Sequence, residues 1–395
     1  MTREQISAAI GEIDDRHISQ AAHFDPEGVY TVPKRKENMF YPNSEKIYTR
    51  RKVGKTLRAV LVAAALVLAL TITALAARNY TDFFDTVFGD SIIKSDDGYV
   101  VPPMGVKGEI IYPARERVAV DTETADALIG DNVVIAEQSL NIRGVTFSVE
   151  SMVMDENGIG VLTYTMENPD GFDRLVISDH GSRFRFEEPS APGDVYGPNI
   201  WLTDKDEEKL SNMSFLDAQR FIAEENSTDT KKEIVVYFAP FQTIEGAAYL
   251  TLEFAVAKEH DPDAMLFSEV CDEESISIPL GEPVAVPVHM AGEGWEVSIS
   301  PLGLVLAPPA GHDFSLGLVI TEDVVIHYSD GTDYVLESED PYTSNTILSA
   351  LGSDDVIRTV FNRLIDPAAV ESVTVSGYID DGYTNKTPLD LTFTK

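Results

Sequence analysis

Residues 140–168 read LNIRGVTFSVESMVMDENGIGVLTYTMEN, and this stretch decides the fold class. Val145, Phe147 and Val149 alternate with polar residues, which is the period of a strand with one buried face. The DENG in the middle of the stretch is a turn signal. The VLTYTM segment after it resumes the period of two, with alternate side chains on opposite faces. The stretch therefore predicts an antiparallel β-hairpin.

Further strand-like runs follow, separated by turn residues. They are EIVVYFAPF, AYLTLEFAVAK, SISIPL, PVAVPVHM, WEVSISPLGLVLAP, LVITEDVVIHYSDGTDYVLES and VESVTVSGYID. The DG in YSDGTDY is itself a hairpin signal. Short strands separated by turns favour antiparallel sandwiches over βαβ units. We therefore predict a mainly β ectodomain of one or two immunoglobulin-like antiparallel sandwiches, with a boundary near residue 280.

Two segments interrupt the strand pattern and are predicted to contain helices. One is the polar stretch 203–230. The other, residues 353–365, has apolar residues on one side at helical spacing. These residues are Val356, Val360, Phe361 and Leu364.

A second informative stretch, residues 50–78, reads RRKVGKTLRAVLVAAALVLALTITALAAR. From Ala59 to Ala77 it carries no charge, and as a helix this run would span about 28 Å, close to the hydrocarbon core of a bilayer. Ala74-Leu75-Ala76 resembles a signal-peptide cleavage site, but 58 residues precede the run. We therefore expect an uncleaved signal-anchor, with one transmembrane helix over residues 59–77.

Cations on one side of this run set the expected orientation. Only Arg78 follows the run directly, whereas five cations precede it. These are Arg50, Arg51, Lys52, Lys55 and Arg58. The positive-inside rule then predicts a single-pass cell-membrane protein with its N-terminus in the cytoplasm and its C-terminal region extracellular.

The formal net charge of −36 is unevenly distributed. Residues 1–58 carry 11 Lys/Arg and 8 Asp/Glu, whereas residues 79–395 carry 18 and 58. The large acidic part would repel nucleic acid, so we expect no nucleic-acid partner. Cys271 is the only cysteine. An exported domain that cannot form an intramolecular disulfide suits the surface of a Gram-positive bacterium, or a bacterial exported protein more generally, better than a eukaryotic cell surface.

Residues 1–58 predict a short cytoplasmic amphipathic helix and a Pro-interrupted linker. Thr2 and Gln5 fit a capping box, and Asp25-Pro26 ends the helix. Its apolar stripe consists of Ile6, Ile10, Ile13, His17 and Phe24, with Ile18 off the stripe. A lone stripe of this kind favours burial in a groove of another protein. A helix lying on the membrane is the alternative, but the polar face is acidic and anionic lipid would repel it.

A search for catalytic motifs finds no G-x-S-x-G, H-E-x-x-H, P-loop or G-x-G-x-x-G. HDPD at 260–263 and GHDFS at 311–315 are more typical of turns than of metal or acid–base sites. The acidic loops do not fit a calcium-binding loop. Trp201 and Trp295 could line a carbohydrate site, although core packing is the favoured interpretation. We predict that the chain is not an enzyme, with no catalytic residue, no metal and no cofactor.

Several features together resemble a known family. The helix AAIGEIDDRHISQAA, a basic linker and an Ala-rich span precede the LNIRGVTFSVESMVMDENGIGVLTYTMEN segment. This order resembles Gram-positive single-span membrane proteins described as anti-sigma-factor-like, whose β-rich ectodomain belongs to a domain-of-unknown-function family. The resemblance covers most of the chain. It implies that the cytoplasmic segment sequesters an extracytoplasmic-function sigma factor while the ectodomain senses the cell envelope.

The resemblance also implies which residues contact the sigma factor. Ile10, Ile13, Asp14 and Ile18 correspond to the family's helix, and the stripe adds Ile6 and Phe24. One departure is that the zinc-type H-x-x-x-C-x-x-C signature of other anti-sigma factors is absent. Sigma binding is thus inferred from the order of parts and not from a motif of known chemistry.

The sequence therefore predicts five parts. They are a cytoplasmic segment (1–58), a transmembrane helix (59–77), a juxtamembrane helix and linker (78–111), a first extracellular β-sandwich (112–280) and a second one (281–395). The expected function is transcription regulation, with a sigma factor, the lipid bilayer and a cell-envelope ligand as partners. The alternative is a surface-anchored binding or adhesion module for cell-wall polymer or glycan.

Overall fold

A computed structural model describes most of the chain from residue 117 onward, together with short stretches before it. The described residues are 83–84, 86–88, 100–101, 110–111, 117–172, 175–176, 193–210, 216–223, 226–242, 245–258, 271–309, 318–338, 343–352, 354–380 and 386–395. Among them, no helix has the length and apolar character needed to cross a bilayer. The predicted amphipathic helix and the predicted span both lie outside the described residues.

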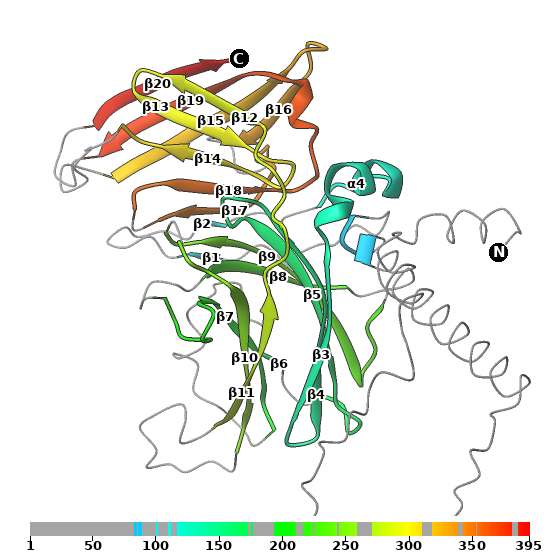
Figure 1. Ribbon diagram of the computed structural model, residues 1–395. Coiled ribbons are helices and arrows are strands. Elements are labelled where there is room, and N and C mark those ends of the chain that lie inside the picture. The colour runs from blue at the N-terminus through cyan, green and yellow to red at the C-terminus, as the bar shows by residue number, and fades with distance from the viewer. Residues whose placement is uncertain are drawn as a thin grey trace, which may run out of the picture. The chain divides into compact units, whose positions relative to one another are not determined.

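The described chain is mainly β and its sheets are almost entirely antiparallel, which confirms the predicted β-rich class (Figure 1). Outside the larger sheets there is a two-residue pair, β1 (Val100–Val101) with β2 (Ile110–Ile111). Helix α4 (Thr122–Ile129) precedes the larger sheets, and Asp121 caps its N-terminus by accepting from the Thr124 amide. Two 3₁₀ turns follow in the described chain, Gly130–Asn132 and Pro367–Ala369.

Among the described residues, nine strands form the first sandwich, a pair of sheets that share one core. They are β3 (Val134–Ile142), β4 (Val145–Met154), β5 (Gly160–Glu167), β6 (Leu175–Val176), β7 (Val195–Thr203), β8 (Leu216–Ile222), β9 (Lys231–Pro240), β10 (Tyr249–Ala257) and β11 (Cys271–Pro279). Sheet I has the order β3-β4-β5-β9-β8, and sheet II has the order β11-β10-β7-β6. The β6–β7 pair is parallel, unlike the antiparallel pairs around it.

Aromatic side chains from both sheets meet in the core of the first sandwich. Phe147 of sheet I lies 4.5 Å from Phe254 of sheet II between ring centroids, and Tyr164 lies edge-on to the same ring. The predicted hairpin is confirmed, because β4 pairs with β5 in antiparallel register. Val145, Phe147 and Val149 all point into this core and are at most 3% exposed.

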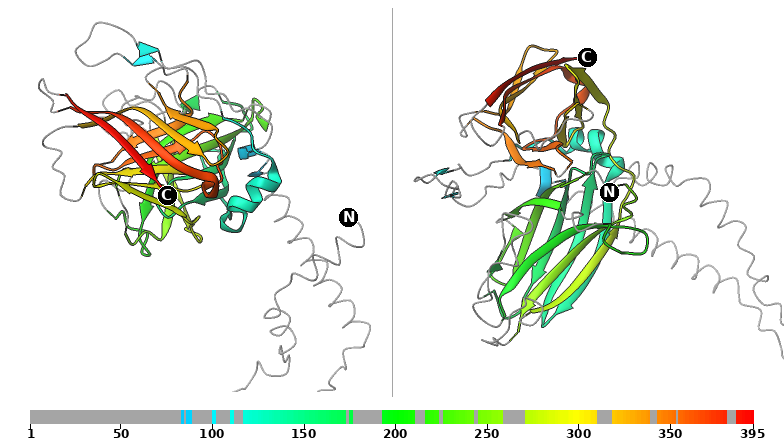
Figure 2. Two further views of the ribbon diagram at one scale, coloured as in Figure 1. Left: turned by 90° about the horizontal axis from the view of Figure 1, so that it is seen from above. Right: turned by 90° about the vertical axis from the view of Figure 1, so that its left-hand side faces the viewer.

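The second sandwich also has nine strands in two sheets. They are β12 (Val288–Gly292), β13 (Trp295–Ile299), β14 (Gly303–Ala307), β15 (Leu318–Tyr328), β16 (Asp333–Glu337), β17 (Thr346–Leu351), β18 (Ile357–Phe361), β19 (Val370–Asp380) and β20 (Lys386–Thr394). Sheet III has the order β12-β13-β14-β18-β17, and sheet IV has the order β16-β15-β19-β20. Figure 2 shows these two sheets curving around a common core. The predicted DG hairpin joins β15 to β16, with Gly331 at φ +85°.

Both predicted helices after residue 200 are wrong. In 203–230, residues 216–222 form strand β8, where Arg220 is buried and donates to the Pro198 carbonyl at 2.6 Å. In 353–365, residues 357–361 form strand β18, which is buried along its whole length. Because both faces of β18 are covered, its sequence lacks the polar–apolar alternation of a half-exposed strand.

A third hydrophobic core joins the two sandwiches, and we call it the junction core. The outer face of sheet I contributes Val153, Val161, Val235, Tyr237 and Ala239, and the outer face of sheet III contributes Val305, Ile347, Leu348, Ala350 and Val360. Helical residues 83–84 and 86–88 lie next to α4 (Figure 1), and their aromatic side chains belong to this core. Phe83, Phe84, Val87 and Phe88 are at most 3% exposed.

Polar contacts hold the 83–88 segment in the junction core. The buried Arg117 guanidinium lies 5.0 Å above the Phe88 ring and donates to the Thr86 carbonyl at 3.3 Å. The Val120 amide donates to the Phe88 carbonyl, and the Asn226 side-chain amide donates to the Thr86 hydroxyl. The segment is therefore an integral part of the folded unit.

Phe84→Ala should lower the free energy of unfolding by about 3–5 kcal/mol, because the substitution leaves a cavity where a fully buried ring packed. Urea unfolding can be followed by Trp201 in the first sandwich and Trp295 in the second. Val118→Ala is the control, since Val118 is 37% exposed and its truncation should cost within about 0.5 kcal/mol. Equal effects of the two substitutions would contradict the burial of the segment.

Candidate functional site

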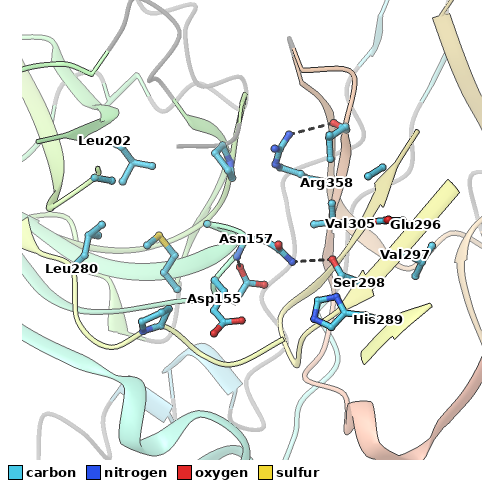
Figure 3. A pocket seen from close by; sticks show the side chains of 18 of the residues that line it. Asp155, Asn157, Leu202, Leu280, His289, Glu296, Val297, Ser298, Val305 and Arg358 are labelled. Atoms are coloured by element: carbon cyan, nitrogen blue, oxygen red, sulfur yellow. Dashed lines mark hydrogen bonds between the residues drawn. The ribbon is translucent and has the colours of Figure 1, made fainter. Parts of the chain in front are cut away.

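A cleft of about 900 Å³ lies where one end of the first sandwich meets the outer face of sheet III (Figure 3). A hollow of this size is in the range of sites for small organic ligands. Its walls come from segments far apart in the sequence, between residues 154 and 358. We therefore take it as the candidate functional site.

One wall of the cleft is the outer face of sheet III. His289, Ser298, Val305 and Arg358 are cross-strand neighbours on β12, β13, β14 and β18. A second row consists of Ala291, Glu296 and Ala307. The intervening residues Trp295, Val297 and Ile299 lie in the core of the second sandwich, so the strand period itself directs Glu296 and Ser298 outward.

The opposite wall is mostly apolar and comes from the end of the first sandwich. Leu202 belongs to the core of that sandwich, and Met154, Ala247 and Leu280 pack against it. In Figure 3, Leu202 and Leu280 lie on one side of the cleft, while Glu296, Ser298 and His289 lie on the other. The cleft thus has one mostly apolar wall and one wall that combines polar and apolar side chains.

The DENG turn between β4 and β5 forms the floor of the cleft and ties the sandwiches together. The buried Asp155 carboxylate accepts from the Asn157 and Ile159 amides, and from the Ser300 hydroxyl at 2.6 Å. The Ser300 oxygen accepts in turn from the Leu302 and Gly303 amides. Because that oxygen already accepts twice, its own proton is directed to Asp155.

Further bonds fix the same turn to the second sandwich and to the linker before it. The Asn157 side-chain amide donates to the Ser298 hydroxyl at 3.3 Å. Glu156 accepts from the Val286 amide through its carboxylate and donates to the Val284 carbonyl through its own amide. Gly158 has φ +82°, and a Cβ there would lie 2.9 Å from Pro240 Cγ, so the tight turn requires glycine.

The cleft lining exposes two carboxylates, whereas its arginine is paired with another carboxylate. Glu156 and Glu296 are both exposed in the cleft. The Arg358 guanidinium is buried and binds both oxygens of Asp354, at 2.9 and 2.7 Å, which neutralises it. His289 is the other basic side chain in the lining.

Burial raises the pKa of Asp155 to about 7, against the opposing effect of its hydrogen bonds from Ser300, Ile159 and Asn157. A buried carboxylate at this position is structural, since all of its bonds serve the turn and the β13–β14 connection. Its role is to hold the floor of the cleft in one conformation.

Ser298 faces His289 across the β12–β13 pair and accepts from the Asn157 side-chain amide. Away from the cleft, His327 lies 2.7 Å from Asp333 and 3.1 Å from Thr374 on the outer face of sheet IV. That trio has the residue types of a hydrolytic site but lies on an outer strand face, where cross-strand pairing explains it. In the described part of the chain, no group of three metal-binding side chains comes together.

The sequence-predicted site residues lie outside the described residues. These are Ile6, Ile10, Ile13, Asp14, Ile18, Phe24, Arg50, Arg51, Lys52, Lys55 and Arg58. HDPD at 260–263 and GHDFS at 311–315 also lie outside them. Trp295 packs in the core of the second sandwich, as the favoured interpretation expects. The Trp201 ring is covered by the Lys209 ammonium, 3.6 Å from its centroid.

Sequence reasoning found the DENG turn but not the cleft that it lines. Only the tertiary fold places Glu156, His289 and Glu296 in the lining of one cleft, because no sequence spacing relates them. The sole sequence signal was the strand period, which marks Glu296 and Ser298 as outward-facing.

Comparison with known proteins adds little. No protein-family model matches the sequence, and no curated protein matches it. A solved structure, described as the crystal structure of the conserved domain protein from Bacillus anthracis, aligns with a TM-score of 0.34 at 11% identity. The alignment covers 67% of this chain and 92% of that one. A likeness this distant says nothing about function.

Asp155→Asn should remove a pH dependence of stability. Because its pKa is raised in the folded state, the Asp155 carboxyl stabilises the fold fully below about pH 4. This contribution to the free energy of unfolding is lost as the pH rises through about 7. Between pH 5 and 8 the wild type should therefore lose stability relative to the variant, by on the order of a few kcal/mol. Melting temperatures of both chains across this range test it. Parallel curves would show that Asp155 ionises normally.

Proposed function

We propose that the chain is a membrane-anchored, anti-sigma-factor-like regulator. In this proposal the cytoplasmic helix sequesters an extracytoplasmic-function sigma factor, the apolar run 59–77 crosses the membrane, and the two sandwiches sense the cell envelope. The observation that carries it is the burial of helical residues 83–88 in the junction core. This segment begins six residues after the predicted span ends.

That burial supports signal transfer because a movement of the sandwiches must then move the chain next to the span. A single helix tethered by a loose linker would transmit little. Here the Phe84 and Phe88 rings and the Thr86 hydrogen bonds fix the segment to both sandwiches. A ligand that binds one arrangement of the sandwiches better than another could therefore bias the position of the span.

The DENG turn connects the cleft with the junction core. Met154 and Asn157 line the cleft, while Val153 and Ile159 on either side of them pack in the junction core with Phe84. A change in the cleft would reach the 83–88 segment through one short, well-ordered turn. We also propose that the sandwiches are immunoglobulin-like, because each consists of two sheets packed around a core.

The regulator proposal is tested at the predicted stripe. Ile10→Asp combined with Ile13→Asp would place two charges in a hydrophobic interface, so co-purification of a sigma factor with the full chain should be lost. Transcription from that factor's promoters should rise. Mass spectrometry of the purified complex and a promoter reporter measure the two effects.

Ala8→Asp combined with Ser19→Asp is the matched control, because it adds the same charge on the opposite side of the predicted helix. Sigma binding should survive in this control. If the stripe variant still holds the factor, or if both variants lose it equally, the stripe is not the sigma-binding surface.

The alternative, a surface-anchored binding module for glycan or cell-wall polymer, has one observation in its favour. The hydroxyls of Thr203, Thr251 and Ser277 form a row across β7, β10 and β11, each 3.1 Å from the next. Deleting residues 1–45 separates the functions. A binding module should keep its cell-wall binding without them, whereas a regulator should lose its sigma factor.

A further inference from the structure

The two walls of the cleft differ in a way that specifies a ligand. The first sandwich presents an apolar wall that continues into its core through Leu202, Met154 and Leu280. Sheet III presents a mixed wall whose polar side chains include Glu296, Ser298 and His289 (Figure 3). A molecule that satisfies both walls must itself have an apolar part and a polar part.

The charge of the polar part follows from the carboxylates. Glu156 on the floor and Glu296 on the wall are exposed in the cleft, whereas the guanidinium of Arg358 is committed to Asp354. Residues 79–395 carry 58 Asp/Glu against 18 Lys/Arg, so the surrounding field is also negative. A cation is complementary to this cleft and an anion is repelled.

We propose that the cleft binds an amphipathic organic cation, an ammonium group on an aliphatic chain. The ammonium lies between Glu156 and Glu296, and the aliphatic chain lies against Leu202, Met154 and Leu280. The volume of about 900 Å³ accommodates a chain of eight or more carbons with its head group. This assignment is independent of the partner of residues 1–58.

The test uses the full chain in zwitterionic nanodiscs and isothermal titration at pH 8 and 150 mM salt, with empty nanodiscs as the blank. The probes are octylammonium, octanoate, 1-octanol and ethylammonium. Octylammonium should bind at one saturable site per chain. Octanoate and octanol should bind at least tenfold more weakly. Ethylammonium should also bind at least tenfold more weakly, because each buried methylene strengthens binding by up to about fourfold.

Glu156→Gln combined with Glu296→Gln keeps the shape of both side chains and removes their charge. It should weaken octylammonium binding at least tenfold and leave octanol binding unchanged. Ala248→Phe, which fills the cleft from its apolar wall, should weaken both probes. Melting temperatures that match the wild type show that the variants fold.

Glu274→Gln combined with Glu371→Gln is the matched control, because it removes the same charge from exposed positions outside the cleft lining. This control should bind octylammonium within twofold of the wild type. Equal weakening in the control would show non-specific attraction to an acidic protein and overturn the assignment. Equal affinity for octanoate, or unchanged binding in the Ala248→Phe variant, would overturn it as well.

Discussion

Strand β5 is buried on both faces, and the rest of the described structure depends on covering both. Leu162, Tyr164 and Met166 point into the core of the first sandwich, while Val161 points to the junction core. Strand β9 repeats the arrangement, with Val236 on one side and Tyr237 on the other. A sheet of this kind would leave a large apolar patch in water if only one face were packed. Sheet III and residues 83–88 cover the second face.

The cleft is a consequence of that packing. Sheet III extends beyond the area that sheet I covers, and its remaining outer face becomes a wall opposite the end of the first sandwich. Val305 marks the transition, since it packs in the junction core and also lines the cleft. The Asp155–Ser300 bond fixes the geometry at this point, because it joins the turn of one sandwich to the β13–β14 connection of the other. Cleft and junction core therefore share the same turn.

The sequence predicts strands where it shows a period of two, as in β4, or a continuous run of strand-forming residues, as in β9, and it fails at β8 and β18. The alternation of Val145, Phe147 and Val149 identified β4 correctly. Strand β18 lost that alternation because both of its faces are buried, and its apolar residues fell at helical spacing by chance. Strand β8 contains Arg220, whose burial depends on the Pro198 carbonyl, a partner that no local pattern reveals.

The candidate site was less predictable still. Its two exposed acidic residues, Glu156 and Glu296, are 140 positions apart and line one cleft only because the sandwiches pack together. The helix at 122–129 carried a readable signal in its Asp121 cap and was nevertheless missed. Turn residues and the apolar–polar alternation along the chain therefore identified turns and single strands. The cleft required the packing of two sheets that the sequence describes separately.

The central claim is that residues 83–88 are part of the folded unit and not a linker. Hydrogen–deuterium exchange on the full chain tests it most directly, with peptides covering 83–88 compared with peptides covering β5. Equal protection of the two segments, lost together on unfolding, is the expected result. Exchange of 83–88 within seconds while β5 stays protected would contradict it.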